Sequence, residues 1–382
     1  ILYISFDFDS FEHSSKMTSY IQNKREDPIT KILEFTLQRL EPCYAVAILR
    51  TMLTNIKTVG IVSEPHAKSR VQILKNNTKY NNEIVKHRLS AIPIHIDDPT
   101  TYDYENIQLE LKVENNNDSY MDVTTEHFRI VDKHTGKQIE GEHSKLFPKN
   151  DMTDDHILFL RLRPKLIDTD TNEQIYLKAD FEICTANENS VYNVVSTCGY
   201  GFTPDKEKQM TEWLKKEKEL KKNNAEDIDE QKKNWFVYDA KRHYKKNSYD
   251  FKIKSVGVYK NDYIMKLACK NIVENLETIK KTILDNKVEI KVDHDNEHTY
   301  EVKIEKDNYT IGKLIEDALY VNYYKKNLLT YISYKKEHPH IDYGVIIMQF
   351  KDSNQYEEKI KEYLQHSVEY CKGIYMAIQN QI

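Results

Sequence analysis

The sequence predicts an α+β fold in which strands and long amphipathic helices alternate along the chain. Residues 32–38 alternate between apolar and polar side chains, which is the period of a half-buried strand. Residues 264–283 and 360–378 instead repeat apolar residues at intervals of three and four, the period of a helix with one buried face. Residues 95–200 contain short strand-like runs separated by Asn, Asp and Gly. The chain therefore combines helix-backed sheets with a mostly β segment in its middle.

Length and composition indicate a folded chain with more than one domain. The 382 residues are enough for two or three domains, each with its own core. A content of 39% hydrophobic and 31% charged residues is typical of globular proteins. The formal net charge of -5 excludes the wrapping of nucleic acid by a general basic charge. No apolar run approaches the roughly 20 residues that span a bilayer, so we expect no membrane association.

Candidate metal ligands are scattered rather than grouped. The five cysteines have no short paired spacing, which favours reduced, mostly buried thiols over disulfides or a zinc site. Residues 151–156 contain three aspartates and a histidine, but this run is more typical of an acidic turn before a strand. The later histidines are predicted to lie in turns and on the surface; they are His294, His298, His338 and His340. We therefore expect no metal and no cofactor.

The first 28 residues are predicted to form a leader. Residues 1–11 alternate like a strand and contain Asp7-Phe8-Asp9. An apolar strand ending in Asp-x-Asp resembles the opening of haloacid-dehalogenase-type phosphatases, in which the first carboxylate is the nucleophile and both bind magnesium. A magnesium-dependent phosphatase using Asp7 and Asp9 is therefore one alternative function, although no matching lysine and acidic-pair motifs follow. The segment lacks a basic flank and is not predicted to be a signal peptide.

A helix and two strands follow the strand at 32–38. Pro42 begins the helix at a position where its missing N–H is not needed. Arg50 lies off the apolar stripe of this helix. The stripe comprises Ala45, Ile48, Leu49, Met52, Leu53 and Ile56. Residues 59–62 and 70–74 are predicted to be strands.

Residues 76–94 have the most distinctive spacing in the chain. Their opening Asn-Asn-Thr cluster, which includes Asn77, predicts a turn, because Asn tolerates and caps reversed backbone. Asn81 or Asn82 can then cap a short helix. Glu83 lies in the first turn of that helix, where a negative charge is favourable to the helix dipole.

The predicted helix has one apolar side and a defined end. The apolar residues are Ile84, Val85 and Leu89. His87 and Arg88 are adjacent, so their side chains must diverge around the helix. Pro93 pushes Ile92 towards an extended conformation, so the helix ends before it.

Two segments with different characters occupy the middle of the chain. The predicted strands of the β-rich segment are residues 108–113, 122–131, 157–162 and 174–183. Residues 203–246 carry a dense mixture of both charges and include a predicted helix. Trp213, Trp235 and the Lys241-Arg242-His243 run favour a nucleic-acid-binding module as a second alternative function. Because the two signs nearly cancel, a solvated helix and loop is the preferred interpretation.

Regular structure resumes near residue 250 and continues to the end. Residues 250–259 are predicted to be a strand leading into the long helix at 264–283. A strand at 300–304 precedes a helix beginning at Thr310. Two further strands around a His-Pro-His turn at 338–340 then lead into the C-terminal helix.

Two motifs resemble the alpha-like assembly subunits of cellular RNA polymerases. Residues 76–94 carry Asn-Thr, Glu, His-Arg-Leu and Ile-Pro-Ile in the order found in the bacterial alpha subunit, the archaeal D subunit and the third subunit of RNA polymerase II. Residues 307–313 (DNYTIGK) and 333–339 (SYKKEHP) resemble the Asp-His-Thr-Leu-Gly-Asn and Gly-Tyr-x-x-x-His-Pro motifs of the eleventh subunit and the archaeal L subunit. The first helix departs from the Asn-x-x-Arg-Arg pattern of the family, because only Arg50 matches it.

The resemblance implies two alpha-like dimerisation domains fused in tandem, as in the RNA polymerases of nucleocytoplasmic large DNA viruses. The larger half would comprise residues 29–94 and 249–285, interrupted by a β-rich insert domain at 95–202 and a charged insertion at 203–248. The smaller half would comprise residues 286–382. The two halves would bury their long helices against each other in a pseudo-twofold unit, and fusion would raise the effective concentration of one half for the other.

The resemblance also implies a non-catalytic role in assembling a DNA-directed RNA polymerase. The partners would be the largest and second-largest polymerase subunits and small polymerase subunits; DNA would be reached only through the complex, and no homodimer is needed. Magnesium would belong to the large catalytic subunits, and the location would be the viral factory in the host cytoplasm and the virion, or the nucleus for a cellular protein. The implied subunit-interface residues are Arg50, Glu83, His87, Arg88, Lys313 and His338. The implied structural turn residues are Asn77, Pro93, Gly312 and Pro339.

Overall fold

The computed structural model divides the chain into two compact units. It describes residues 19–165, 172–223, 227–292, 298–305, 309–351 and 356–382. The described part of the first unit lies within residues 19–51, 197–254 and 265–382, and the second unit comprises residues 52–196 and 255–264. Helices and antiparallel sheets in these residues confirm the α+β class. Asp7, Asp9, His294, Asp307 and Asn308 lie outside the described residues.

The first unit contains a four-stranded sheet with the order β1-β2-β12-β11. Its strands are β1 (Ile21–Glu26), β2 (Leu33–Gln38), β11 (Val195–Pro204) and β12 (Tyr244–Ser255). The predicted strand at 32–38 is confirmed as β2, and its apolar residues Leu33, Phe35 and Leu37 are buried. Thr36 alternates with these residues and is also buried; its hydroxyl donates a hydrogen bond to Asp250 Oδ1 at 2.8 Å.

Two helices belong with this sheet. As predicted, α2 (Pro42–Thr54) begins at Pro42, and its stripe residues Ala45 and Ile48 are completely buried. The long helix α7 (Asn261–Leu284) follows β12 and buries Ile272 and Leu276 along its apolar face. Both helices therefore follow the apolar periodicity read from the sequence.

A second four-stranded sheet has the order β13-β14-β16-β15. Its elements are β13 (Ile290–Val292), β14 (Thr299–Glu305), α8 (Tyr309–Leu319), β15 (Leu329–Lys335), β16 (Tyr343–Phe350) and α9 (Tyr356–Gln379). The predicted strand pair around the His-Pro-His turn is confirmed, with Ile341 N donating to His338 O at 3.1 Å. Helix α8 begins at Tyr309, one residue before the predicted start.

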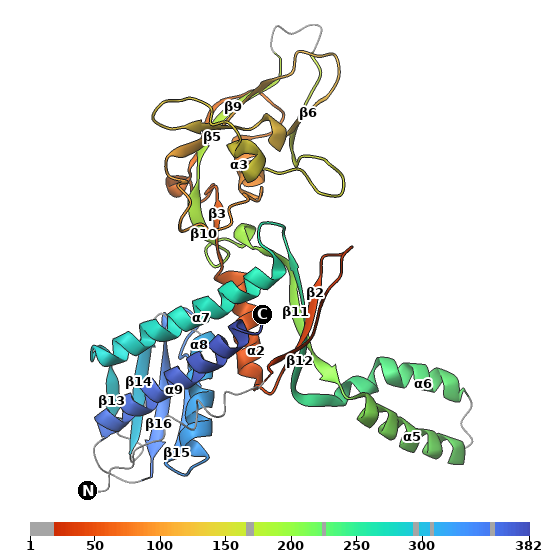
Figure 1. Ribbon diagram of the computed structural model, residues 1–382, viewed down its shortest axis with the longest axis vertical. Helices are drawn as coiled ribbons and strands as arrows, with labels where there is room; N and C mark the ends of the chain where they lie inside the picture. The colour runs from red at the N-terminus through yellow and green to blue at the C-terminus, as the bar shows by residue number, and fades with distance from the viewer. Residues whose placement is uncertain (1–18, 166–171, 224–226, 293–297, 306–308, 352–355) are drawn as a thin grey trace. The chain divides into compact units, whose positions relative to one another are not determined.

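The two sheets of the first unit share one topology. Each set of elements runs strand, strand, helix, strand, strand, long helix: β1, β2, α2, β11, β12, α7 in the first repeat and β13, β14, α8, β15, β16, α9 in the second. Within each repeat the first, second, fourth and third strands are neighbours in that order. Helices α7 and α9 both have 24 residues. The first unit is thus built from an internal structural repeat (Figure 1).

A helical hairpin joins β11 to β12 inside the first repeat. It consists of α5 (Lys206–Lys222), α6 (Ile228–Val237) and a short 3-10 helix (Asp239–Arg242). Trp213, Trp235 and Ala240 are buried together, and the two indole rings lie 5.8 Å apart. Most residues of the two helices are exposed, as expected for a solvated segment, but the two tryptophans also give it a small core of its own.

The second unit is mostly β. Its larger sheet has the order β4-β9-β5-β7 and consists of β4 (Val71–Asn76), β5 (Ile107–Glu114), β7 (Arg129–Asp132) and β9 (Gln174–Asp180). Two strand pairs accompany it: β3 (Lys57–Gly60) with β10 (Glu182–Thr185), and β6 (Met121–Thr124) with β8 (Leu158–Leu162). Helices α3 (Asn82–Ser90) and α4 (Glu142–Leu146) complete the unit. One apolar core includes residues of these sheets and of α3.

Three expectations for this part of the chain need correction. The predicted strand at 122–131 is interrupted by a 3-10 helix, Thr125–His127, at whose start the Thr124 N–H donates to His127 Nδ1 at 3.2 Å. The predicted strand at 174–183 is two strands, because β9 pairs with β5 whereas β10 pairs with β3. Residues 52–94 belong to the β-rich unit rather than with residues 29–51, because β4 pairs with β9.

Candidate functional site

The buried contacts between the two repeats form the first candidate interface. The hydroxyl of Tyr375 on α9 donates a hydrogen bond to the backbone carbonyl of Tyr44 on α2 at 3.3 Å. The Tyr44 hydroxyl lies 3.9 Å from Cys371 Sγ, and that thiol lies 3.4 Å from the Leu314 carbonyl of α8. Tyr44, Cys371 and Tyr375 are all buried. Burial raises the pKa of the Cys371 thiol to about 12, so it is neutral and packs as an apolar group.

Charged side chains join the two long helices beside this core. Lys280 Nζ lies 2.5 Å from Glu369 Oε1, and Lys372 Nζ lies 2.9 Å from Glu277 Oε1. The pKa of the Glu277 carboxyl is lowered, mainly by the hydrogen bond from Lys372 and further by the positive charge of that lysine. Exposed and partly exposed pairs of this kind add little to stability, because water screens them. Their contribution is to fix which faces of α7 and α9 meet.

The last residues of the chain contact the first described strand. Gln381 Oε1 accepts hydrogen bonds from the backbone N–H of Tyr20 at 2.7 Å and of Ile21 at 3.1 Å. Lys24 Nζ donates to the carbonyl oxygen of Ile382 at 2.7 Å. The end of the second repeat is therefore tied to β1 of the first repeat.

Gly312 has a packing role that differs from the predicted one. It lies inside α8 rather than in a turn, so its assignment as a turn residue is wrong. A Cβ atom at Gly312 would fall onto the ring of Tyr334 in β15, and a Cβ at Gly344 in β16 would meet the same ring. The tyrosine ring therefore occupies space that only glycine leaves free.

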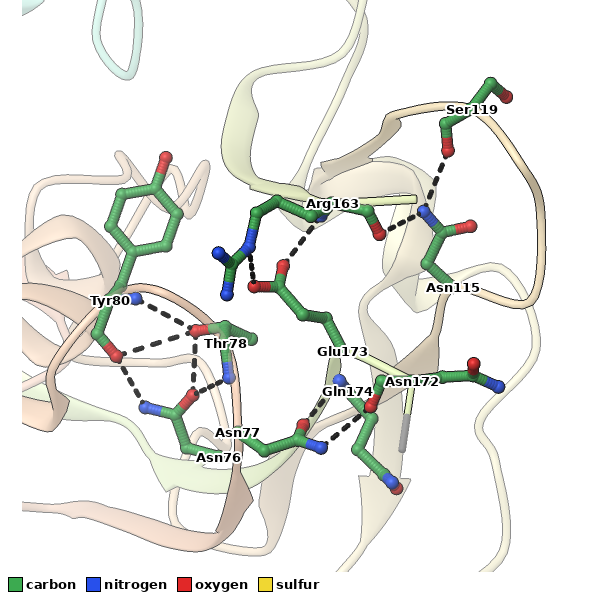
Figure 2. Close-up of polar contacts among 10 residues, drawn as sticks. All are labelled: Asn76, Asn77, Thr78, Tyr80, Asn115, Ser119, Arg163, Asn172, Glu173 and Gln174. Carbon is green, nitrogen blue, oxygen red and sulfur yellow. Dashed lines mark hydrogen bonds and ion pairs between the residues drawn. The ribbon is translucent and has the colours of Figure 1, made fainter. Parts of the chain in front are cut away.

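The predicted turn at 76–78 is held by side-chain hydrogen bonds (Figure 2). Asn76 Oδ1 accepts from the backbone N–H of Thr78 at 3.0 Å and from its hydroxyl at 2.8 Å. Asn77 Nδ2 donates to the Asn172 carbonyl at 2.7 Å, and Asn77 Oδ1 accepts from the Gln174 N–H at 2.7 Å. Asn77 thus continues the β4–β9 pairing into the turn, as a structural turn residue would.

The helix after this turn begins and ends as the sequence indicates. Asn81 is the N-cap of α3, and its Oδ1 accepts from Ile84 N at 2.8 Å. Val85 and Leu89 are buried, and the helix ends at Ser90, three residues before Pro93. Glu83 is exposed in the first turn.

His87 and Arg88 diverge and make different contacts. His87 Nε2 contacts Glu64 Oε1, and both side chains are exposed. Arg88 Nε donates to the Phe159 carbonyl at 2.6 Å, and Nη2 donates to the Leu158 carbonyl at 3.4 Å. Arg88 therefore holds α3 against β8 within the second unit, while His87 and Glu83 remain at the surface.

A polar network at the ends of β5, β8 and β9 was not found from the sequence. Glu173 is buried; it accepts from the backbone N–H of Arg163 at 2.6 Å and pairs with its guanidinium at 2.5 Å (Figure 2). Asn115 is fully buried, and its Nδ2 donates to the carbonyls of Ser119 and Arg163. A buried carboxylate with a guanidinium partner is a structural arrangement that fixes loops. No sequence signal indicates it, because the partners are distant along the chain.

The remaining predicted interface residues lie in the first unit. Arg50 is exposed on α2, and Lys313 on α8 forms an ion pair with Glu316 at 2.5 Å. His338 is exposed, and its ring lies 4.8 Å from that of His340. Pro339 lies in the turn between β15 and β16, as predicted. Thus Asn77, Glu83, His87, Arg88 and Pro93 belong to one unit, and Arg50, Gly312, Lys313, His338 and Pro339 belong to the other.

A cavity in the first unit has a volume of about 270 Å³. It is lined by Glu41, Pro42, Cys43, Lys313, Glu316, Asp317, Tyr320 and Ile332. Burial raises the pKa of Asp317, and the negative charge of Glu41 adds to that effect.

Among the described residues, no group of three or more His, Cys, Asp or Glu side chains could hold a metal ion. In the same residues, no helix has the length and apolar character needed to cross a membrane.

No protein-family model matches the chain, and no curated protein sequence matches it at a significant level.

Proposed function

We propose that this chain is a non-catalytic assembly subunit of a DNA-directed RNA polymerase, in which two alpha-like halves pair within one polypeptide. The observation that carries the proposal is the repeated topology of the first unit, with the strand order first-second-fourth-third and a 24-residue helix in both repeats. Along the chain, the motif that resembles the third subunit of RNA polymerase II (residues 76–94) precedes the motifs that resemble the eleventh subunit (residues 307–313 and 333–339).

The contacts between the repeats support intramolecular pairing. Tyr44 and Tyr375 join the repeats through a buried contact, and α7 and α9 join them through two ion pairs. A buried, apolar contact region of this kind is typical of obligate partners. Fusion keeps the two halves at equal amounts and at a high effective concentration. One such platform offers a different surface to each of two large partners.

The contacts in the second unit distinguish the roles of Glu83, His87 and Arg88. Arg88 donates to backbone carbonyls of β8, so we assign it to shaping the α3 surface rather than to touching a partner. Glu83 and His87 are exposed on α3, and we assign them to contact with a large subunit. Arg50, Lys313 and His338 are the corresponding candidates on the first unit.

The phosphatase alternative has no structural support in the described part of the chain. Asp7 and Asp9 lie outside it, so the geometry that such a reaction requires is not described. A phosphatase that uses Asp7 and Asp9 gives no reason for the repeated topology. A subunit made of two paired alpha-like halves does give one.

The decisive experiment is affinity purification of the tagged chain from its native source, followed by mass spectrometry and a promoter-independent RNA synthesis assay. We expect two very large polymerase subunits to co-purify together with RNA synthesis. Recovery of the chain alone, with magnesium-dependent phosphatase activity that Asp7→Asn abolishes, would overturn the proposal.

A matched pair of charge reversals tests the α3 surface. Glu83→Lys changes an exposed residue of α3, and we expect it to reduce the amount of one large subunit that co-purifies. Lys137→Glu changes an exposed turn residue of the same unit and serves as the control. Equal recovery of both large subunits with both variants would remove α3 from the proposed docking surface.

A further inference from the structure

The base of the α5–α6 hairpin, where β11 ends and β12 begins, carries exposed aromatic rings. The rings of Phe202 and Tyr244 are stacked, with centroids 4.5 Å apart and planes 28° apart. They are not covered by the fold, since Phe202 is 45% exposed and Tyr244 is 44% exposed. On the inner side, Phe202 contacts the buried ring of Tyr249 at 5.7 Å, which holds the exposed pair in place.

Basic residues flank Tyr244 on both sides in the sequence, from Lys241 to Lys246. Lys241, Lys245 and Lys246 are exposed and form no ion pair with any residue that the structure describes. Arg242 pairs with Asp239 at 3.7 Å and shares that carboxylate with Lys216. Residues 241–246 therefore carry a net positive charge, although the formal net charge of the chain is -5.

The neighbouring acidic groups are occupied by the fold. Asp205 is the N-cap of α5 and accepts from Lys208 N at 3.1 Å. Asp250 accepts hydrogen bonds from the hydroxyls of Thr36 and Thr203. These two carboxylates are hydrogen-bonded within the local structure, and neither forms an ion pair with the three lysines.

We propose that this surface, formed by Phe202, Tyr244, Lys241, Lys245 and Lys246, binds single-stranded nucleic acid. The stacked rings offer an aromatic face to an unpaired base, and the lysines neutralise its phosphates. An acidic peptide would satisfy the lysines but would leave the aromatic pair without a planar partner. The inference goes beyond the assembly function and does not depend on it, because the free chain carries the whole surface.

The test uses the full chain and fluorescence anisotropy with labelled oligothymidylate, labelled oligouridylate, a labelled duplex of the same length and a labelled polyglutamate peptide. We expect the single strands to bind more tightly than the duplex or the peptide. Tyr244→Ala should weaken single-strand binding roughly tenfold, the effect of losing one stacked base. The double variant Lys245→Gln, Lys246→Gln should reduce the slope of log affinity against log salt by about 1.4, or about 0.7 for each lost phosphate contact.

Matched variants separate this surface from a general charge effect. Lys232→Gln with Lys233→Gln removes two adjacent exposed lysines from α6 of the same hairpin, and Tyr120→Ala removes a 62% exposed tyrosine from the second unit. Both should bind single strands like the unmodified chain, and circular dichroism should show that all variants are folded. The proposal is overturned if the control lysines cause the same loss, if the peptide or the duplex binds as tightly as the single strands, or if Tyr244→Ala has no effect.

Discussion

The hydroxyl of Tyr375 donates a hydrogen bond to the backbone carbonyl of Tyr44, a residue 331 positions earlier in the chain. Both side chains are buried, and their ring centroids lie 5.9 Å apart. Because Tyr44 belongs to α2 and Tyr375 to α9, this contact joins the first repeat to the second within one core. The two repeats should therefore unfold together rather than as independent domains.

Two substitutions at Tyr375 separate its hydrogen bond from its packing. Tyr375→Phe removes only the hydroxyl and should lower the free energy of unfolding by about 1 kcal/mol. Tyr375→Ala also leaves a cavity in the shared core and should lower it by about 3–5 kcal/mol. Urea unfolding followed by the helical circular dichroism signal measures both values. Tyr331→Ala, at a tyrosine that is 49% exposed, is the control and should change stability by about 0.5 kcal/mol or less.

Gly312→Ala should destabilise the second repeat although alanine is the better helix former. The added methyl group would overlap the ring of Tyr334, so the side chain or α8 must move, at a cost of about 1–3 kcal/mol. Gly201→Ala on β11 is the matched control, because a Cβ there has no heavy atom of a described residue within 4 Å. Equal unfolding midpoints for the two alanine variants would contradict the close packing of α8 on β15.

A double-mutant cycle identifies Tyr334 as the cause. Tyr334→Ala should destabilise the chain by itself, because it leaves a cavity between α8 and the sheet. In its background, Gly312→Ala should no longer destabilise, since the space for the methyl group is open. Additive losses in the double variant would show that Gly312 acts through something other than the tyrosine ring.

Regular elements with a strong apolar period were predictable from the sequence. The strand β2 and the helices α7 and α9 follow their patterns because each buries one continuous face. The N-cap of α3 was also predictable, since Asn81 acts on a backbone N–H only three residues away. Helix caps and buried faces of this kind depend only on residues within one segment, so that segment's own sequence predicts them.

Features that depend on distant segments were not predictable in the same way. The division of residues 174–183 into β9 and β10 depends on two different partners, β5 and β3. The ion pair between the exposed Arg163 and the buried Glu173 reads in the sequence as two ordinary surface charges. The contact of Tyr375 with Tyr44 had a partial signal, because Tyr375 lies four residues after Cys371 on the same helical face.

Arg88→Ala should loosen β8 in the free chain. Removing the guanidinium takes away the hydrogen bonds to the Phe159 and Leu158 carbonyls, which should lower stability by about 1–2 kcal/mol. Amide hydrogen exchange across residues 158–162 should become faster in this variant, whereas Lys86→Ala on the same helix should leave it unchanged. If amide hydrogen exchange across residues 158–162 is unchanged in Arg88→Ala, Arg88 does not hold β8, and we would assign it to direct contact with a partner.

The ion pairs between α7 and α9 should stabilise the first unit at neutral pH and not in acid. The pKa of Glu277 lies below its ordinary value of 4.5, first because of the hydrogen bond from Lys372 and then because of its charge. For Glu369, burial opposes the shift, but the hydrogen bond from Lys280 and the charge of Lys372 outweigh it and lower the pKa. A lowered folded-state pKa means that the stabilisation is complete above the unfolded-state pKa and is lost as pH falls through the folded-state value.

The double variant Glu277→Gln, Glu369→Gln tests this dependence. It should be less stable than the unmodified chain at about pH 7, and the difference should shrink as the pH falls through the lowered folded-state pKa values of Glu277 and Glu369, below which both carboxyl groups are protonated in the folded and the unfolded state. Unfolding in urea at each pH, followed by circular dichroism, measures the difference. Glu274→Gln removes a carboxylate that pairs with Lys270 of its own helix at 3.9 Å, so it changes the charge of α7 without touching α9. A difference between the double variant and the unmodified chain that persists at low pH would mean that the glutamates act through packing, and the ion pairs would then not be what aligns the two long helices.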